Sequence, residues 1–271
     1  MLRRARFVQN VSKRCPAGAT VAPGTYPSLP MPTPKTYVLA HGSWHGAWCW
    51  RKVIALLSAA GHRVHALSYT GMGDRAHLLH PGITIDTFVA DIVGLIESEE
   101  LEDAVLVGHS FGGIPVTGAA AKVAPRLRRL VYLDAALVQS GQSAFDTYSA
   151  ADVQARTLAA QQVHGGLAVP VPKRISPIWG LTPQMPDYPW FMRRLTPHPL
   201  ASFTTPLHYE GLLGAGLAVT YVECTAPVNP LLVGARALAV AQPGWDYVKL
   251  AAPHEAMITH PREVAELLLA A

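Results

Sequence analysis

Cysteine and charged residues are both scarce in this chain of 271 residues. The three cysteines, Cys15, Cys49 and Cys224, have no metal-ligand spacing, and their odd number leaves one thiol over in any pairing. We therefore expect no disulfide framework, and we interpret them as reduced thiols in a cytoplasmic protein. Only 15% of the residues are charged and 50% are hydrophobic, which excludes a disordered chain and favours a well-filled core.

Acidic residues are absent from the first 35 positions, and the basic residues there account for the net charge of +4. The remaining residues comprise 16 basic and 18 acidic ones, so we expect no nucleic-acid partner. The first 33 residues also lack the apolar run of a secretory signal, and no membrane association is expected. We interpret residues 1–33 as an extension outside the fold, either disordered or upstream of a true start at Met31. An organelle transit peptide is the alternative.

The stretch from Ala104 to Gly113 reads A-V-L-V-G-H-S-F-G-G, and a helix-compatible segment, 114–122, follows it. This order predicts a strand, a tight turn and a helix, with Ser110 at the turn. Gly108 and Gly112, two residues to either side, leave room for the strained backbone that such a serine adopts. The N-terminus of the helix would favour negative charge that develops beside Ser110. Ser110 is therefore the predicted nucleophile.

Strand-like and helix-like segments alternate along the rest of the chain. Helices are expected at 48–60, where Gly61 stops the pattern, and at 85–97, where Asp86 is the expected N-cap. The expected strands are 36–40, 62–69, the segment before Ser110, 129–133, 218–224 and 247–250, and a last helix covers 262–271. The alternation predicts one α/β domain over 34–271 with a mostly parallel, doubly wound sheet.

The alternation stops between residues 137 and 216. This interval holds a predicted helix near 150–162, then eight prolines between Pro170 and Pro199 interleaved with large apolar side chains. It predicts a small inserted cap over the site, with ordinary surface packing of a loop-rich segment as the alternative. The candidate pocket residues are Trp179, Trp190 and Phe191 from the cap, with Trp44 and His109 from the body.

A serine hydroxyl needs a base to remove its proton and a carboxylate to orient that base. His254 follows the last expected strand and precedes the last helix, where the base belongs in the chain order Ser, acid, His. The loop after 218–224 carries no acid, and Asn229 there could orient a histidine without balancing its charge. Asp134, directly after 129–133, is the predicted acid. A missing acid is one alternative, and Glu223 or Asp246 is the other.

Two backbone N–H groups are expected to form an oxyanion hole, one from Phe111 after the nucleophile and one from Ser43 in the glycine loop after the first strand. His41 and His45 are four residues apart on that loop but lack the H-E-x-x-H pattern, so no metal site is predicted. No cofactor is expected.

Three motifs carry a resemblance to a known family: H-G-S-W-H-G-A-W-C-W at 41–50, G-H-S-F-G-G at 108–113 and P-H-E-A-M at 253–257. They resemble the α/β-hydrolase superfamily, in particular the branch of plant methylesterases, hydroxynitrile lyases and related bacterial esterases. The resemblance implies a parallel sheet with a small helical cap, and it matches Ser110 and His254 to the catalytic serine and histidine. Pro227 stands where the plant members have an aspartate, whereas Asp134 falls where haloalkane dehalogenases carry their acid.

The predicted function is a serine hydrolase that cleaves small to medium apolar alkyl or aryl carboxylic esters through an acyl-enzyme. A hydroxynitrile lyase is less favoured, because Glu255 and His109 stand where those enzymes carry a lysine and an acid. A non-catalytic receptor on the same scaffold is a further alternative. The match of 71–76 to a dinucleotide motif is disfavoured because 78–81 would break the required helix. The expected partner is a small-molecule ester, and a homodimer is a candidate assembly.

Overall fold

The structure is a computed structural model that describes residues 34–271. The predictions for residues 1–33, and the prediction for Cys15, lie outside the described residues.

One parallel sheet of six strands organises the described chain, in the order β2-β1-β3-β4-β7-β8. Its strands are β1 (Thr36–Ala40), β2 (Arg63–Ala66), β3 (Ala104–His109), β4 (Leu127–Leu133), β7 (Ala218–Cys224) and β8 (Asp246–Leu250). Every residue of β3 is buried, as expected for a central strand that is covered on both faces. The predicted α/β-hydrolase fold with a parallel, doubly wound sheet is confirmed.

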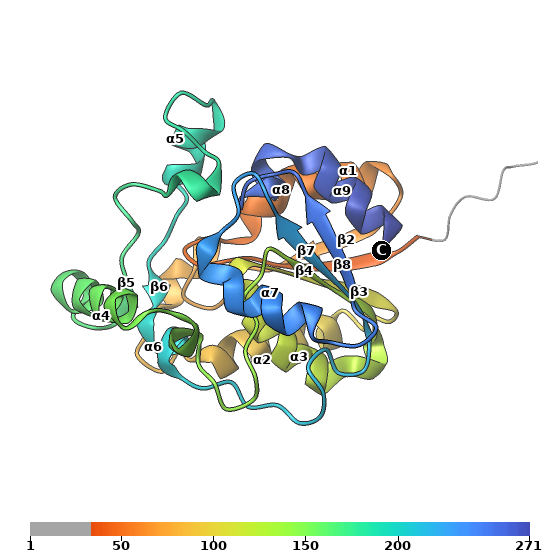
Figure 1. Cartoon of the computed structure of the whole chain (residues 1–271), viewed down its shortest axis with the longest axis horizontal. Helices are drawn as coiled ribbons and strands as arrows, with labels where there is room; N and C mark the ends of the chain where they lie inside the picture. Colours follow the sequence, from red (N-terminus) through yellow and green to blue (C-terminus); the bar gives the residue numbers. More distant parts are fainter. Residues whose placement is uncertain (1–33) are drawn as a thin grey trace, which may run out of the picture. The chain divides into compact units, whose positions relative to one another are not determined.

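Helices cover both faces of this sheet (Figure 1). On one face lie α1 (Arg51–Ala59), α8 (Ala256–Thr259) and α9 (Pro261–Ala270), and on the other lie α2 (Ile85–Ser98) and α3 (Gly113–Val123). The helix α7 (Val233–Val240) connects β7 to β8. The side chains of Phe88, Ile92 and Ile96 on α2 are fully buried. Their four-residue spacing in the sequence therefore marks the buried face of this helix.

Several boundaries differ from the sequence prediction. The strand expected over 62–69 is paired only as β2, because the chain then leaves the sheet edge for the loop that carries Tyr69. The helix expected over 48–60 begins as a 3-10 turn before α1. The predicted N-cap, Asp86, was wrong: α2 begins after Thr84, whose backbone N–H donates to the Thr87 hydroxyl at 3.2 Å.

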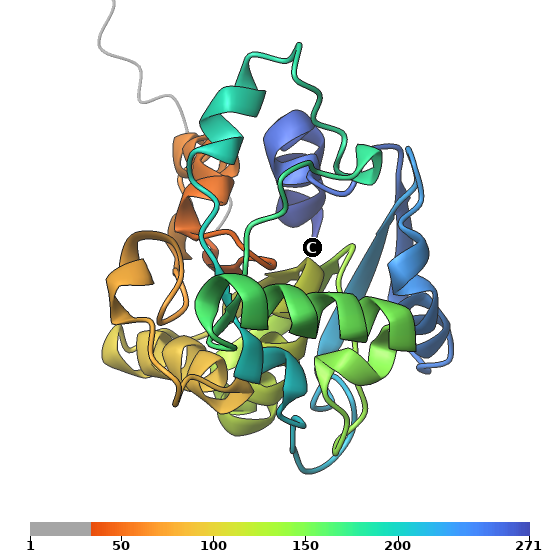
Figure 2. The same cartoon turned by 90° about the vertical axis from the view of Figure 1, so that its left-hand side faces the viewer.

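The interval 137–216 contributes no strand to the six-stranded sheet, and all of it is described by the structure. It contains α4 (Ala150–His164), β5 (Ala168–Val169), α5 (Asp187–Met192), β6 (His198–Pro199) and α6 (Leu200–Thr204). The strands β5 and β6 form a short antiparallel pair. Figure 2 shows α4 crossing in front of the strand ends, with α5 near the top of the view.

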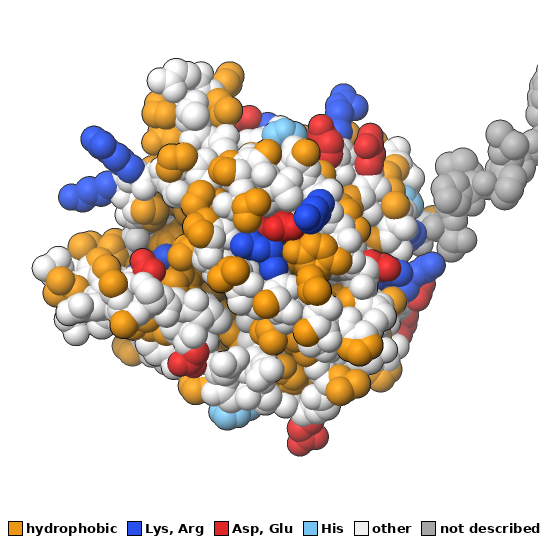
Figure 3. Space-filling model, viewed as in Figure 1, with side chains coloured by type: hydrophobic (Ala, Val, Ile, Leu, Met, Phe, Trp, Pro, Cys, Tyr) orange, Lys and Arg blue, Asp and Glu red, His pale blue; other side chains and the backbone are white. Residues whose placement is uncertain are grey.

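Short 3-10 turns complete the chain, and several of them carry residues of the site. They are η1 (Ala47–Trp50), η2 (Gly73–Leu78), η3 (Ser110–Gly112), η4 (Ala124–Arg126), η5 (Ala144–Thr147), η6 (Pro177–Trp179) and η7 (Pro230–Leu232). In the described residues, no helix has the length and apolar character needed to cross a bilayer. Charged side chains of both signs are interspersed with hydrophobic ones over the face shown in Figure 3.

The glycine at position 112 gives the first testable prediction. A Cβ at Gly112 would lie 2.5 Å from the carbonyl oxygen of His41, which is backbone and cannot move aside cheaply. We expect Gly112→Ala to lower the free energy of unfolding by about 1–3 kcal/mol, as overpacking does. Urea unfolding followed by circular dichroism measures this.

The matched control is Gly94→Ala in α2, where an added Cβ meets nothing within 4 Å. Alanine there should raise the free energy of unfolding by about 0.5–1 kcal/mol because glycine is a poor helix former. Equal effects of the two substitutions would contradict the steric argument.

Candidate active site

Ser110 lies immediately after β3, at the carboxyl edge of the sheet, with a left-handed φ of 54°. A non-glycine residue rarely adopts this conformation, and it marks a strained turn. The flanking glycines are required by close backbone contacts: a Cβ at Gly108 would lie 2.9 Å from the Gly112 carbonyl oxygen. The turn is therefore the one that the glycine spacing predicted, and it leaves the Ser110 hydroxyl facing a cavity.

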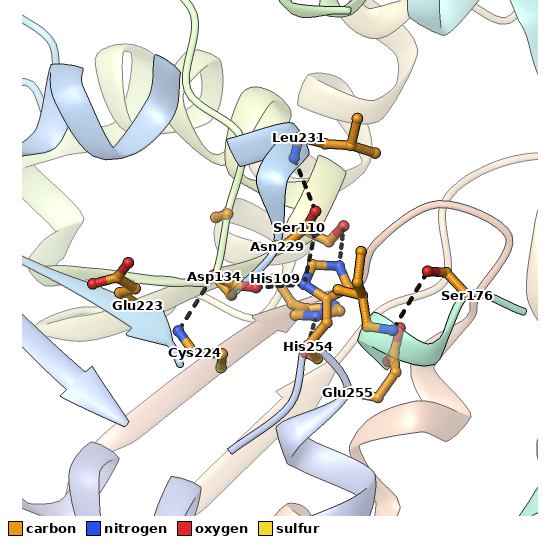
Figure 4. A network of polar contacts seen from close by, with 12 residues as sticks. His109, Ser110, Asp134, Ser176, Glu223, Cys224, Asn229, Leu231, His254 and Glu255 are labelled. Carbon is orange, nitrogen blue, oxygen red and sulfur yellow. Dashed lines mark hydrogen bonds and ion pairs between the residues drawn. The ribbon is translucent and has the colours of Figure 1, made fainter. Parts of the chain in front are cut away.

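The imidazole of His254 lies between Ser110 and Asp134 (Figure 4). Its Nε2 is 2.9 Å from the Ser110 hydroxyl oxygen, and its Nδ1 is 2.6 Å from Oδ2 of Asp134. These distances join a hydroxyl, an imidazole and a carboxylate in one line of hydrogen bonds. The backbone N–H of His254 donates to the carbonyl of Ile178 in the cap, which ties the loop of the base to the inserted segment.

Asp134 is fully buried and directly follows β4, the neighbour of β3 in the sheet. Its backbone N–H donates to the carbonyl of Val222 at 2.7 Å, and its Oδ1 accepts a hydrogen bond from the N–H of Cys224 at 3.3 Å. The carboxylate therefore crosses the end of β7 to reach the loop after β8. Asn229, on the loop after β7, lies farther from His254 Nδ1, at 3.5 Å.

The two alternative acids are engaged elsewhere. Glu223 forms an ion pair with Arg236 at 3.3 Å, and Asp246 forms one with Arg129 at 2.8 Å. Neither side chain contacts His254 among the hydrogen bonds and ion pairs of residues 34–271.

The environment of His254 raises its pKa above the ordinary value. Burial by itself lowers the pKa, but the hydrogen bond that His254 donates to Asp134 and the negative charges of Asp134 and Glu255 outweigh it. The site thus stabilises the imidazolium form of His254.

The glycine loop after β1 supplies the other wall of the site. A Cβ at Gly42 would lie 2.8 Å from the Cβ of Ser110, so only glycine allows the loop to approach the turn this closely. Ser43 and Phe111 both line the cavity. Within residues 34–271 neither backbone N–H has a hydrogen-bond acceptor, so both are available to a bound oxygen atom.

The cavity in front of Ser110 has a volume of about 760 Å³. Trp44 and Trp179 line it, as does Tyr148 near the start of α4. The guanidinium of Arg156 lies 4.7 Å from the centre of the Tyr148 ring and 5.2 Å from that of Trp44. No sequence pattern singles out Tyr148 or Arg156, because α4 carries no strong apolar face and its orientation depends on the cap as a whole.

Three predicted pocket residues do not line the cavity: His109, Trp190 and Phe191. Phe191 is fully buried behind the wall, where its ring packs against His45, Trp48 and Trp179. Trp190 packs edge-on against Trp48. These aromatic residues support the pocket wall from behind instead of forming its surface.

His109 is fully buried beneath the site, and its Nε2 donates to the backbone carbonyl of His254 at 2.9 Å. Burial lowers the pKa of His109 to about 3, so this imidazole is neutral at neutral pH. The contact holds the loop of the base from below. Position 109 next to the serine was noticed in the sequence, but only the fold shows that its side chain points to the loop after β8.

Ligand atoms of His109, His254 and Glu255 lie within 4.8 Å of one another, which makes them the candidate metal cluster of the described residues. Both nitrogens of His254 are already engaged by Ser110 and Asp134, and Nε2 of His109 is used by a carbonyl. Only Nδ1 of His109 lacks a partner among these nitrogens, and the Glu255 carboxylate faces Nε2 of His45 at 3.2 Å. This leaves fewer than the three protein ligands of a catalytic zinc site.

Comparison with known proteins assigns the scaffold. The Alpha/beta hydrolase family matches residues 37–267. A carbendazim hydrolyzing esterase of Nocardioides sp. (strain SG-4G) is 39% identical over 246 residues, which cover 86% of this chain and 98% of that protein. Methylesterase 10 of Arabidopsis thaliana is 38% identical over 100 residues, 36% of each chain.

A solved structure agrees. An extracellular alpha/beta-hydrolase from a Paenibacillus species superposes with a TM-score of 0.72 at 23% identity, covering 88% of this chain and 99% of that one. The family match extends over most of the described chain and includes both the glycine loop and the loop of His254. The protein therefore belongs to the alpha/beta hydrolase family.

Proposed function

We propose that this protein is a serine esterase, with Ser110 as nucleophile, His254 as base and Asp134 as the carboxylate that orients the base. The observation that carries the proposal is the unbroken line of hydrogen bonds from the Ser110 hydroxyl through both nitrogens of His254 to Asp134, with separations of 2.9 and 2.6 Å. An esterase-type hydrolase also agrees with the relative that matches nearly its whole length to this chain.

The reaction follows from this geometry. Nε2 of His254 accepts the hydroxyl proton as Ser110 attacks the ester carbonyl, and the Asp134 carboxylate stabilises the resulting imidazolium. The N–H groups of Ser43 and Phe111 hold the oxyanion of the tetrahedral intermediate. The imidazolium then gives its proton to the leaving alcohol, and a water molecule, activated in the same way, releases the acid from Ser110. No step requires a cofactor.

The cavity supports small to medium esters with an apolar alkyl or aryl part. The indole rings of Trp44 and Trp179 and the aliphatic side chains of Val169, Val171 and Leu231 line the cavity. Apolar surface of this kind is the usual lining of a small-molecule site. We include an aryl ester among the preferred substrates because flat aromatic walls suit a flat ring.

The location and assembly of the protein remain predictions. In the described part of the chain, Cys49 and Cys224 are both free and buried, which agrees with a reducing, cytoplasmic location. A homodimer remains the candidate assembly.

Hydrolysis of p-nitrophenyl acetate and butyrate tests the proposed activity. The wild type should turn both esters over, and Ser110→Ala should lose at least about a hundredfold in kcat, because the nucleophile is gone. A fluorophosphonate probe should label the wild type and leave Ser110→Ala unlabelled. If the folded wild type neither hydrolyses these esters nor reacts with the probe, the proposal is wrong.

Replacing the proposed acid gives a separate prediction. Asp134→Asn should lower kcat by about 10²- to 10⁴-fold, since the amide no longer stabilises the imidazolium. Without the Asp134 charge, burial dominates and the pKa of His254 falls. His254 must be neutral to act as base, so the acid limb of the residual pH–rate profile should move to lower pH.

Asn229→Ser is the matched control for Asp134→Asn. Serine keeps an N-cap acceptor for η7 and changes only the neutral group at 3.5 Å from His254. This control should leave the acid limb in place. An unchanged kcat in Asp134→Asn would show that the acid was assigned wrongly while leaving the nucleophile intact.

A further inference from the structure

A second carboxylate, that of Glu255, is buried beside the proposed base. Glu255 follows His254 in the chain, and its side chain is 1% exposed (Figure 4). One carboxylate oxygen lies 3.2 Å from Nε2 of His45. Neither oxygen has a hydrogen-bond donor with good geometry in the described part of the chain. A buried carboxylate with so few partners is costly and calls for a functional explanation.

His45 connects this carboxylate to the proposed oxyanion loop. Nδ1 of His45 lies 2.5 Å from the backbone carbonyl oxygen of Ser43, so Nδ1 carries a proton and donates it. The other ring nitrogen faces the carboxylate of Glu255. His45 therefore bridges the Ser43 carbonyl and the Glu255 carboxylate.

Aromatic rings pack around His45, which lines the cavity together with Glu255. The His45 ring stacks on Trp48, with 5.4 Å between ring centres, and Phe191 and Trp179 close two more sides. The aromatic residues behind the pocket wall thus surround the contact between His45 and Glu255. In this low-dielectric environment the electrostatic interaction between the two side chains is stronger than in water.

We propose that Glu255 is a positioning residue of the esterase site, which acts through His45 to hold the Ser43 peptide in register with the His254 base. The proposal rests on the proposed esterase function. This chain of contacts begins at Glu255, the residue next to the base. It ends at the Ser43 carbonyl, close to the N–H of Ser43 that would bind the oxyanion. Breaking the contacts of His45 would displace that N–H donor, and small displacements of catalytic groups lower the rate strongly.

Glu255 also contributes charge to the site. Burial raises its pKa, but the neighbouring histidines, His45 first, outweigh burial and lower it to about 2, so Glu255 is an anion at neutral pH. The other titratable groups that face Glu255 are His109, which is neutral, the base His254, and the thiols of Cys49 and Cys224. Burial raises the pKa of both thiols, which keeps them neutral. With Asp134, Glu255 is one of the two anions that favour the His254 imidazolium.

The experiment compares pH–rate profiles of two variants that break the same pair from opposite ends. Glu255→Gln removes the negative charge, so the pKa of His254 should fall and the acid limb of kcat/KM should move to lower pH. His45→Asn keeps a donor in reach of the Ser43 carbonyl but removes the imidazole that faces Glu255. The unbalanced anion should then raise the pKa of His254 and move the acid limb to higher pH.

Both variants should also lower kcat by between about tenfold and about a hundredfold with little change in KM, because the oxyanion is bound only in the transition state. The matched control is Glu223→Gln, which removes another largely buried carboxylate, one that is paired with Arg236 and not with the site. Its acid limb should coincide with that of the wild type. Thermal unfolding of all three variants separates loss of fold from loss of activity.

The outcomes distinguish this proposal from the proposed function. If the wild type hydrolyses esters and Ser110→Ala does not, but both pair variants keep the wild-type limb and kcat, the positioning role is refuted and the esterase stands. The positioning role would also be refuted if the acid limbs of both variants moved in the same direction. A general loosening of the site would have that effect, because it does not depend on which charge is removed. If Glu255→Gln does not fold, the direction of the His45→Asn shift decides.

Discussion

The hydrogen bond between His254 and Asp134 is the interaction on which the geometry of this site depends. It joins the loop after β8 to the residue after β4, across the intervening strand β7, with 2.6 Å between nitrogen and oxygen. To make it, Asp134 takes a left-handed φ of 40°, and Ser110 takes one of 54°. Strain of this kind persists only where the surrounding structure holds it. Here the parallel sheet does so, because it brings the carboxyl ends of its strands to one edge.

The inserted segment does more than cover the cavity. Its backbone carbonyls at Ile178 and Trp179 accept hydrogen bonds from the N–H groups of His254 and Glu255, and Trp44 of the glycine loop donates its indole N–H to Val169. Both loops that carry the proposed catalytic groups are therefore tied to the cap. A change in the cap would be transmitted to the base and to the oxyanion loop through these bonds.

Four buried histidines near the site have different roles, and their environments explain why. His41 accepts the N–H of Tyr69 and donates to the Gly42 carbonyl, and burial lowers its pKa to about 3. His109 is neutral for the same reason and supports the loop of the base. His254 and His45 each face a carboxylate, and the neighbouring carboxylates raise the pKa of His254. A neighbouring anion thus distinguishes His254 from the buried, neutral imidazoles of His41 and His109.

The amino-acid sequence by itself determined the order of the elements, the turn at Ser110 and the position of the base. Hydrophobic periodicity and the glycines at 108 and 112 are local constraints, so they can be recognised without the fold. Asp134 was predicted because it follows a strand and because the loop after β7 holds no acid. The structure places it within hydrogen-bond distance of His254.

Only the tertiary structure decided which aromatic residues face the substrate cavity and which support it. Trp44 and Trp179 line the cavity, whereas Trp190 and Phe191 lie behind it, although all four are aromatic residues that the sequence predicts in the pocket. The pairing of His45 with Glu255 was also invisible in the sequence, since 210 positions separate the two residues. Their contact exists because β1 and β8 end at the same edge of one parallel sheet. No local sequence pattern indicates which loops meet at that edge.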